Sequence, residues 1–372
     1  MENTSNLGAI VAWSGFALAF VFGAVGNKVN FCTMGAVSDI VNMGDWGRMR
    51  MWLLAIAVAI TGSQTLQLLG LVDLSRSIYT SPNFTGLSFI VGGFVFGVGM
   101  TLGSGCGSKT LIRIGGGNLK SLVVYVFLGV SAYMTLRGLF GQFRVSALQP
   151  VAVNFEAYGI KGQDLPSLLA GTGIDMNTLR ITIAAIVTAG LLVFVFKDRE
   201  FRTSFDYILG GVVVGLVVVA GWYVTGHIGY KENPDTLEMT FFGTNTRAAE
   251  SLTFVAPLAY TLELLMLWTD KSLAATFGIM AALGVVLGSF AYAVAFRKFR
   301  WEGFTTAEDL GNHIIGGILM GFGGVTALGC TIGQGITGFS TLALGSIVTF
   351  LAIIAGSAVT LKYQYWKLAK EA

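Results

Sequence analysis

The amino-acid sequence predicts an all-α polytopic membrane protein. Hydrophobic residues make up 54% of the 372 residues and charged residues only 12%, against about 25% charged residues in soluble domains. The mean hydropathy is +0.72. Apolar stretches close to the length of about 20 residues that crosses a bilayer recur along the chain. These observations predict about nine transmembrane helices in contact with a lipid bilayer. The small net charge of +3, without a basic run, argues against a nucleic-acid partner.

We expect membrane-spanning helices where charges are absent or few. These segments are residues 8–25, 52–72, 86–103, 121–136, 181–196, 207–226 and 272–296, followed by two crossings within 314–361. No positive charges precede the first segment and no small-residue cleavage motif follows it, so we expect a retained helix and not a signal peptide. Residues 251–269 contain Pro257 and Glu263, and we expect this re-entrant segment to enter the membrane and return on the same side.

The uncharged stretch at residues 314–361 is too long for one span and short for two. Two spans of about 20 residues would leave about eight residues for the turn between them. The turn would contain Gly329, Cys330, Gly333 and Gly335. Non-helical backbone at membrane depth is tolerated only when it is buried in protein or lines a cavity. The stretch therefore predicts a broken hairpin around Cys330.

The distribution of basic residues predicts the orientation of the chain. With nine crossings and the N-terminus outside, most of the 23 Lys and Arg residues lie on the cytoplasmic side, as the positive-inside rule requires. The loops at residues 137–180 and 231–250 are then external. The C-terminus is cytoplasmic in this arrangement.

The sequence also contains an internal repeat. VGGFVFGVG at residues 91–99, followed by Gly105 and Cys106, matches IGGILMGFG at 315–323, followed by Gly329 and Cys330, at an offset of 224. More loosely, residues 30–33 match 251–254, which places Thr253 opposite Cys32. In the nine-crossing topology the matching segments run in opposite directions. We therefore expect one integral membrane domain over residues 1–372, built from two inverted pseudo-symmetric repeats at about 8–140 and 206–362, joined by a loop and an extra span at 141–200. Such repeats commonly hold a transport site between them.

The three cysteines, Cys32, Cys106 and Cys330, are candidate site residues. None lies in a CxxC motif and an odd number cannot all pair, so a disulfide framework is not expected. A single buried cysteine is usually a small hydrophobe. The pseudo-symmetry, however, brings Cys106 and Cys330 toward one axis, where they would face a shared polar path. The alternative is that they are packing residues left by a duplication. Cys32 lies in a short segment that resembles a re-entrant hairpin, and we expect it to complete the set.

Thiols on a membrane path suit a soft anion. A neutral thiol is a weak hydrogen-bond donor with a polarizable sulfur. Glycines beside the cysteines expose backbone N–H groups, and helices that start at Gly107 or Thr331 would direct their positive ends toward an anion. We expect substrate contacts from Thr253, Lys109 and Gln334, and backbone or packing roles for Gly105, Gly107, Gly329 and Gly333. Lys109 could instead be an ordinary cytoplasmic anchor, and Gln334 could simply satisfy the backbone.

Other functions have weaker support. Three thiols and 12 Met residues would suit Cu(I), but no MxxM cluster accompanies the cysteines. Walker A, nucleophile-elbow and HExxH motifs are absent from the sequence, so we expect a non-enzyme without metal or cofactor. Two alternatives stay open. One is a membrane sulfurtransferase that works through a persulfide on Cys106 or Cys330. The other is an assembly factor whose cysteines only pack.

The motifs resemble a known family. GSGCGSK at residues 103–109, SLTF at 251–254, GGILMGFGG at 316–324 and LGCTIGQG at 328–335 are similar to the YeeE/YedE family of bacterial inner-membrane proteins, over nearly the whole chain. The resemblance implies an hourglass-shaped thiosulfate-uptake transporter of the inner membrane with inserted helices that do not cross. It implies that Cys32, Cys106 and Cys330 contact thiosulfate in turn through S–H···S hydrogen bonds, and that a TusA-like sulfurtransferase is the cytoplasmic partner. Some relatives are proposed to move other sulfur or selenium species. The family often carries an acidic residue where this chain has Tyr260.

Overall fold

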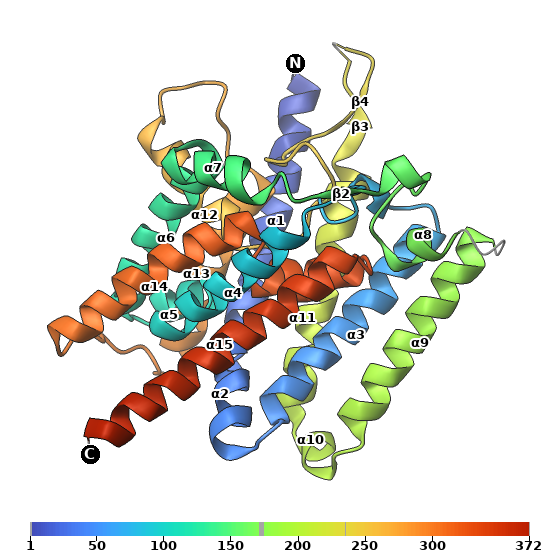
Figure 1. Ribbon diagram of the computed structural model, residues 1–372. Helices are drawn as coiled ribbons and strands as arrows, with labels where there is room; N and C mark the ends of the chain where they lie inside the picture. Colours follow the sequence, from blue (N-terminus) through green and yellow to red (C-terminus); the bar gives the residue numbers. More distant parts are fainter. Residues whose placement is uncertain (1, 171–174, 235, 372) are drawn as a thin grey trace.

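The structure is a computed structural model that describes residues 2–170, 175–234 and 236–371, and it forms a bundle of long helices (Figure 1). The longer helices of its first part are α1 (Glu2–Lys28), α3 (Gly47–Leu68), α4 (Gly86–Leu102), α6 (Leu119–Arg137) and α9 (Met176–Phe196). Those of the second part are α11 (Phe205–Tyr223), α13 (Phe277–Ala295), α14 (Ala307–Thr326) and α15 (Leu344–Glu371).

Short elements connect the long helices. The short α-helices are α2 (Thr33–Met43), α5 (Gly107–Gly115), α7 (Leu139–Phe143), α8 (Leu165–Leu169), α10 (Arg199–Thr203) and α12 (Ala256–Met266). The described residues also form two 3₁₀ turns, η1 (Leu74–Arg76) and η3 (Phe155–Tyr158). Three further turns are π-helical, η2 (Arg144–Leu148), η5 (Val224–Ile228) and η6 (Gly333–Gly338). Two small antiparallel sheets pair β1 (Asn83–Phe84) with β2 (Val153–Asn154) and β3 (Tyr230–Glu232) with β4 (Met239–Phe241). In their register Phe84 faces Val153 and Tyr230 faces Phe241.

The helices confirm the predicted all-α polytopic membrane class. Within the described ranges, eight helical stretches are long and apolar enough to cross a membrane. The ninth predicted crossing corresponds to α14, which is not among the eight. Its first turn carries Glu308 and Asp309, and many of its remaining residues are glycine, so its apolarity is lower. Nine crossings therefore stay a prediction. The re-entrant segment forms α12, whose 11 residues extend about 16 Å, roughly half of the hydrocarbon thickness.

Glycines bring α4 and α14 into backbone contact. A Cβ atom at Gly92 would lie 2.8 Å from the carbonyl oxygen of Gly323, and one at Gly323 would lie 2.6 Å from that of Gly92. Gly99 and Gly316 are related in the same way, at 2.8 Å in both directions. Because real Cβ atoms do not approach this closely, larger residues would force the helices apart. These glycines therefore let α4 and α14 pack directly against each other.

The packing partners of the two parts of the chain are reciprocal. Helix α1 packs along α13 and α11 packs along α3, while α14 packs along α6 and α4 packs along α15. If α1 is exchanged with α11 and α3 with α13, the α1–α13 pair becomes the α11–α3 pair. If α4 is exchanged with α14 and α6 with α15, the α14–α6 pair becomes the α4–α15 pair. A pseudo-twofold axis between two related halves would produce this exchange. The boundaries of the halves, about 8–140 and 206–362, stay a prediction.

The hairpin around Cys330 is wider than the sequence suggested. Helix α14 ends at Thr326 and α15 begins at Leu344, so about 17 residues separate them and not about eight. The difference arises because both helices extend past the uncharged stretch, α14 toward Ala307 and α15 toward Glu371. The connection includes a buried helical segment at residues 331–340, part of which is the π-helix η6.

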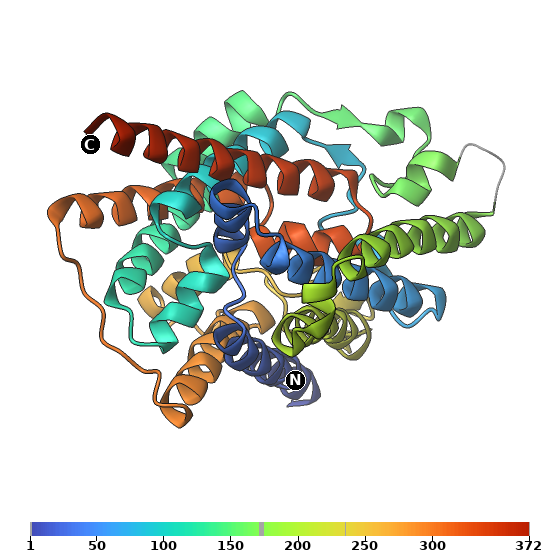
Figure 2. The same cartoon turned by 90° about the horizontal axis from the view of Figure 1, so that it is seen from below.

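The connecting segments define two faces of the bundle. The N-terminus, α7, α8 and both small sheets lie on one face, here called the N-terminal face, and α10 and the C-terminus lie on the other, the C-terminal face (Figure 1). The described parts of the loops at 137–180 and 231–250 thus share a face with the N-terminus. Helix α9 lies at the margin of the bundle, with only 11% of its most apolar stretch buried (Figure 2).

Candidate substrate path

Each cysteine lies at a break between two helices. Cys32 is the N-cap of α2 and Cys106 is the N-cap of α5, and a helical turn begins at Thr331, directly after Cys330. At each break, the residue two positions before the cysteine is left-handed, with φ values of 53° at Asn30, 57° at Ser104 and 59° at Leu328. The preceding helix ends there and the next begins at the cysteine. Backbone N–H groups at the starts of the second helices therefore surround the thiols.

Two of the thiols accept hydrogen bonds from these N–H groups. Cys32 Sγ accepts from the backbone N–H of Gly35 at 3.3 Å, and Cys330 Sγ accepts from those of Gly333 and Phe254, both at 3.4 Å. Cys106 Sγ lies 3.3 Å from the Ser108 hydroxyl. A sulfur that accepts from an N–H group keeps its own S–H available as a donor.

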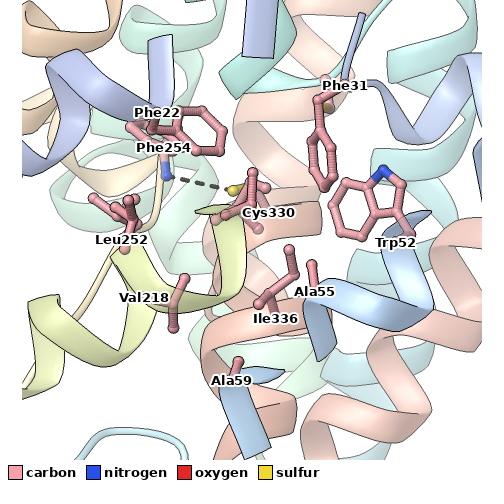
Figure 3. Close-up of a cluster of buried hydrophobic side chains, with 14 of the residues drawn as sticks. Phe22, Phe31, Trp52, Ala55, Ala59, Val218, Leu252, Phe254, Cys330 and Ile336 are labelled. Carbon is pink, nitrogen blue, oxygen red and sulfur yellow. Dashed lines mark hydrogen bonds between the residues drawn. The ribbon is translucent and has the colours of Figure 1, made fainter. Parts of the chain in front are cut away.

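Phe254 connects the two cysteine motifs of the repeat. Its backbone N–H donates to Cys330 Sγ (Figure 3), while its carbonyl oxygen would lie 2.5 Å from a Cβ at Gly107, next to Cys106. Cys106 and Cys330 are near enough to interact electrostatically. The residues that the offset of 224 pairs in the sequence thus meet at one place in the fold.

Aromatic rings close the space around the cysteines. Phe22 stacks on Phe254 at 5.7 Å between centroids and contacts Phe31 at 6.3 Å, and Phe31 stacks on Trp52 at 4.7 Å. Figure 3 shows these rings around Cys330. Cys32 is 5% exposed, Cys106 is 1% exposed and Cys330 is 0% exposed. The centre of the molecule is therefore closed in this structure.

The looser repeat match needs correction. Helix α2 begins directly after Cys32, whereas α12 begins three residues after Thr253. The helix boundaries therefore pair Cys32 with Val255 and Phe31 with Phe254, not Cys32 with Thr253. The segments NFCT at 30–33 and SLTF at 251–254 share no identical residue at matched positions, so the sequence alone could not fix their alignment.

Thr253 nevertheless lies beside Cys330, with its hydroxyl 4.0 Å from the sulfur. It lines a cavity of about 190 Å³, here called the inner cavity, on the side of the bundle that faces the N-terminal loops. Other polar residues of this cavity are Tyr79, Asn245, Thr246, Glu250, Ser251 and Tyr260. At the end of this cavity, position 333 has room only for glycine, because a Cβ atom at Gly333 would lie 2.4 Å from Thr253 Oγ1. The inner cavity therefore leads to the Cys330 break.

A wider outer cavity of about 710 Å³ adjoins the inner one and shares Asn245 and Tyr260 with it. Arg137 and Arg247 line this outer cavity. Arg137 also forms an ion pair at 3.2 Å with Glu263, a buried carboxylate of α12. Glu263 lines the outer cavity as well, so the charged groups there are two arginines and one carboxylate, and their net positive charge attracts anions.

On the other side of the cysteines lies a third cavity of about 200 Å³, here called the exit cavity. Its basic residues are Lys109, Arg113, Lys298 and Arg300. Lys109 is 6% exposed, donates to Asn30 Oδ1 and interacts electrostatically with the thiols of Cys32 and Cys106. This burial argues against the role of an ordinary surface anchor. As far as the described residues line them, none of the three cavities includes a cysteine.

The remaining predicted site residues, Gln334, Gly329 and Gly105, pack at the helix breaks beside Cys330 and Cys106. Gln334 is buried, its Nε2 donates to the carbonyl of Ala327 at the end of α14, and its Oε1 has no partner among the described residues. A Cβ at Gly329 would lie 3.1 Å from Gln334 Cγ, and one at Gly105 would lie 3.0 Å from Lys109 Cγ. Gln334 lines none of the three cavities, so its observed contact is with the backbone.

Sequence reasoning missed two kinds of residue. The aromatic residues Phe22 and Phe31 lie in apolar segments that look like ordinary helix cores, and only the fold brings them to the cysteines. Glu250 ends the loop at 231–250, for which the sequence predicts only an external position. The signal that could have found it is its position one residue before the SLTF motif at 251–254.

The fold and the cysteine breaks define a class, a multi-pass membrane protein with soft donor groups buried between cavities on its two sides. Comparison with known families agrees: the family model for sulphur transport matches residues 28–359, and the chain belongs to this family. It is 28% identical over 352 residues to the thiosulfate transporter TsuA of Spirochaeta thermophila, covering 93% of this chain and 96% of the relative. It is 25% identical over 340 residues to the thiosulfate transporter TsuA of Escherichia coli K12, covering 87% and 86%.

Proposed function

We infer that this protein transports thiosulfate into the cell. The observation that carries the proposal is the set of three buried thiols at helix breaks, between a cavity system on one face and a basic cavity toward the other. Thiosulfate combines a soft terminal sulfur with a charged sulfonate group, which matches thiols and backbone N–H groups in one place. The names of the two relatives support this substrate over other sulfur or selenium species.

The path begins in the outer cavity, where Arg137 and Arg247 concentrate the anion. The ion then enters the inner cavity, where the Thr253 hydroxyl can hold it beside Cys330. From Cys330 it passes to Cys106, and then to Cys32 and Lys109. Each thiol donates its S–H to the sulfur of thiosulfate. Weak contacts at several points let the ion leave each site, as transport requires.

The aromatic rings act as a gate. Phe254 lies between the inner cavity and Cys106 and stacks on Phe22. Passage requires these rings to move, because the cysteines are buried in the closed arrangement. The gate prevents water and smaller ions from following the substrate.

The exit cavity delivers the ion to the cytoplasm. Lys109, Arg113, Lys298 and Arg300 attract the anion there, and their charge fits an inner-membrane protein whose N-terminal face is periplasmic. A TusA-like sulfurtransferase is the proposed recipient at this face. The protein itself moves the ion without making or breaking a covalent bond.

The test is uptake of labelled thiosulfate into sealed vesicles that contain the purified protein. Uptake that exceeds that of empty vesicles and persists with excess unlabelled sulfate is expected, because sulfate lacks the soft sulfur. Uptake equal to that of empty vesicles would contradict the proposal. Mass spectrometry of the same protein tests the enzyme alternative, since a persulfide that accumulates on Cys106 or Cys330 during turnover would favour sulfur transfer.

A further inference from the structure

The inner cavity contains a carboxylate on the route of an anion. Glu250 lies in the loop between β4 and α12, outside the membrane-spanning helices, and its side chain lines the inner cavity with Thr253 and Tyr79. An ionised carboxylate would repel thiosulfate at this place. The outer cavity carries arginines, whereas the inner cavity has no basic residue among the described residues that line it. The carboxylate therefore conflicts with anion transport unless it is neutral.

The position of Glu250 is tightly specified. Thr225 Oγ1 donates to the backbone carbonyl of Glu250, and the backbone N–H of Glu250 donates back to Thr225 Oγ1 at 3.2 Å. Its side chain accepts from the Thr246 hydroxyl at 2.9 Å and from the backbone N–H groups of Asn245 and Thr246. The carboxylate of this half-buried residue is thus held in one place at the wall of the cavity.

We propose that Glu250 is the proton-binding residue of the inner cavity, and that thiosulfate enters this cavity only when Glu250 is protonated. The proton comes from water on the N-terminal face. A protonated Glu250 no longer repels the anion and can donate a hydrogen bond to a sulfonate oxygen. Proton binding and anion binding then favour each other at one site. The proposal rests on the proposed function and adds a pH-dependent step to the entry of the anion.

The electrostatics of the site agree with this role. Burial raises the pKa of Glu250 to about 7, and the hydrogen bonds from Thr246 and the loop backbone oppose this shift only in part. The proton is therefore bound and released near neutral pH.

The tyrosine hydroxyls beside Glu250 do not titrate in this range. Tyr79 and Tyr260 interact electrostatically with Glu250 from two other elements, and phenols ionise near pH 10 in water. Arg247 lies on the same loop, three residues before Glu250. His227 lies in the same π-helix as Thr225, but its Nδ1 is bonded to the carbonyl of Leu71 and its ring stacks on Tyr223.

The experiment measures the initial rate of thiosulfate uptake at low substrate concentration, with the vesicle interior at fixed pH and the external pH varied from about 5.5 to 8.5. Wild-type uptake is expected to fall as the pH rises through about 7, approaching tenfold per pH unit well above it. Glu250→Gln, which stays neutral, is expected to keep the high rate across the range. Glu238→Gln on the exposed β3–β4 hairpin and His227→Gln are the controls, and both should retain the wild-type pH profile.

Two results would overturn the inference while the proposed function survives. One is a Glu250→Gln profile that falls with pH as the wild type does. The other is a folded Glu250→Gln protein that takes up no thiosulfate at any pH, because the carboxylate would then be needed in its charged form. If the wild type itself takes up no thiosulfate at any pH, the proposed function and the inference both fail.

Discussion

At the scale of single residues, the site depends on a close approach between Phe254 and Gly107. The Phe254 peptide donates to Cys330 and presses its carbonyl oxygen against Gly107. This contact fixes the spacing between the two cysteine breaks. The glycine next to Cys106 is thus required by packing, in addition to exposing an N–H group.

Gly107→Ala should therefore destabilise the fold. The added Cβ would lie 2.5 Å from a backbone oxygen, which cannot rotate away, and overpacking of this kind costs about 1–3 kcal/mol. Thermal unfolding in detergent should show a lower midpoint than the wild type. Gly303→Ala is the matched control, because a Cβ there meets nothing within 4 Å. Equal midpoints for the two variants would contradict the close approach.

Gly329→Val is expected to abolish uptake while Lys370→Ala leaves it unchanged. A Cβ at Gly329 already lies 3.1 Å from Gln334 Cγ, and the two methyl groups of valine would displace the turn that carries Cys330. Lys370 is exposed in the last turn of α15. The vesicle uptake assay compares the two at equal protein levels, and similar rates would argue against the hairpin as part of the path.

At the scale of elements, a buried ion pair holds the short helix α2 in place. Arg48 at the start of α3 donates through Nε and Nη2 to the two carboxylate oxygens of Asp39, which is 3% exposed. The same guanidinium lies against Gly35, whose N–H donates to Cys32. The pair therefore positions the Cys32 break.

Arg48→Met should loosen α2 and expose Cys32. Removing one partner leaves a buried charge without compensation, which costs about 3–5 kcal/mol. Labelling by maleimide should be faster at Cys32 in the variant than in the wild type. Arg76→Met, which breaks a pair with Asp73 on the surface, should change little, because exposed pairs contribute about 0–1 kcal/mol. Unchanged labelling of Cys32 in Arg48→Met would refute this role.

The elements also show what the sequence could predict and what it could not. Long apolar helices and the Gly-Cys repeat are local patterns, so the membrane class and the breaks at Cys106 and Cys330 followed from them. The predicted length of the break after α14 was too short, because the polar ends of α14 and α15, which include Glu308 and Lys362, extend past the apolar stretch. The rings of Phe22 and Phe31 and the carboxylate of Glu250 reach the site only through tertiary packing. No local pattern marks such contacts.

At the scale of the whole molecule, the two faces predict the topology in the cell. Glu238 lies on the N-terminal face and Gly303 in the loop before α14, and both are exposed. Glu238→Cys should react with a membrane-impermeant maleimide on intact cells, and Gly303→Cys only after permeabilisation. The native cysteines are at most 5% exposed and should give little background. The reverse labelling pattern would invert the proposed orientation.

The central claim is that a cysteine sulfur contacts thiosulfate as it crosses the membrane, and Cys330→Ser tests it most directly. Serine keeps a hydrogen-bond donor of similar size but replaces the soft sulfur with a hard oxygen. Thiosulfate uptake by the reconstituted variant, at an unfolding midpoint close to that of the wild type, is predicted to fall at least about tenfold, equivalent to about 1.4 kcal/mol of lost interaction. Uptake at the wild-type rate would contradict a cysteine-lined path.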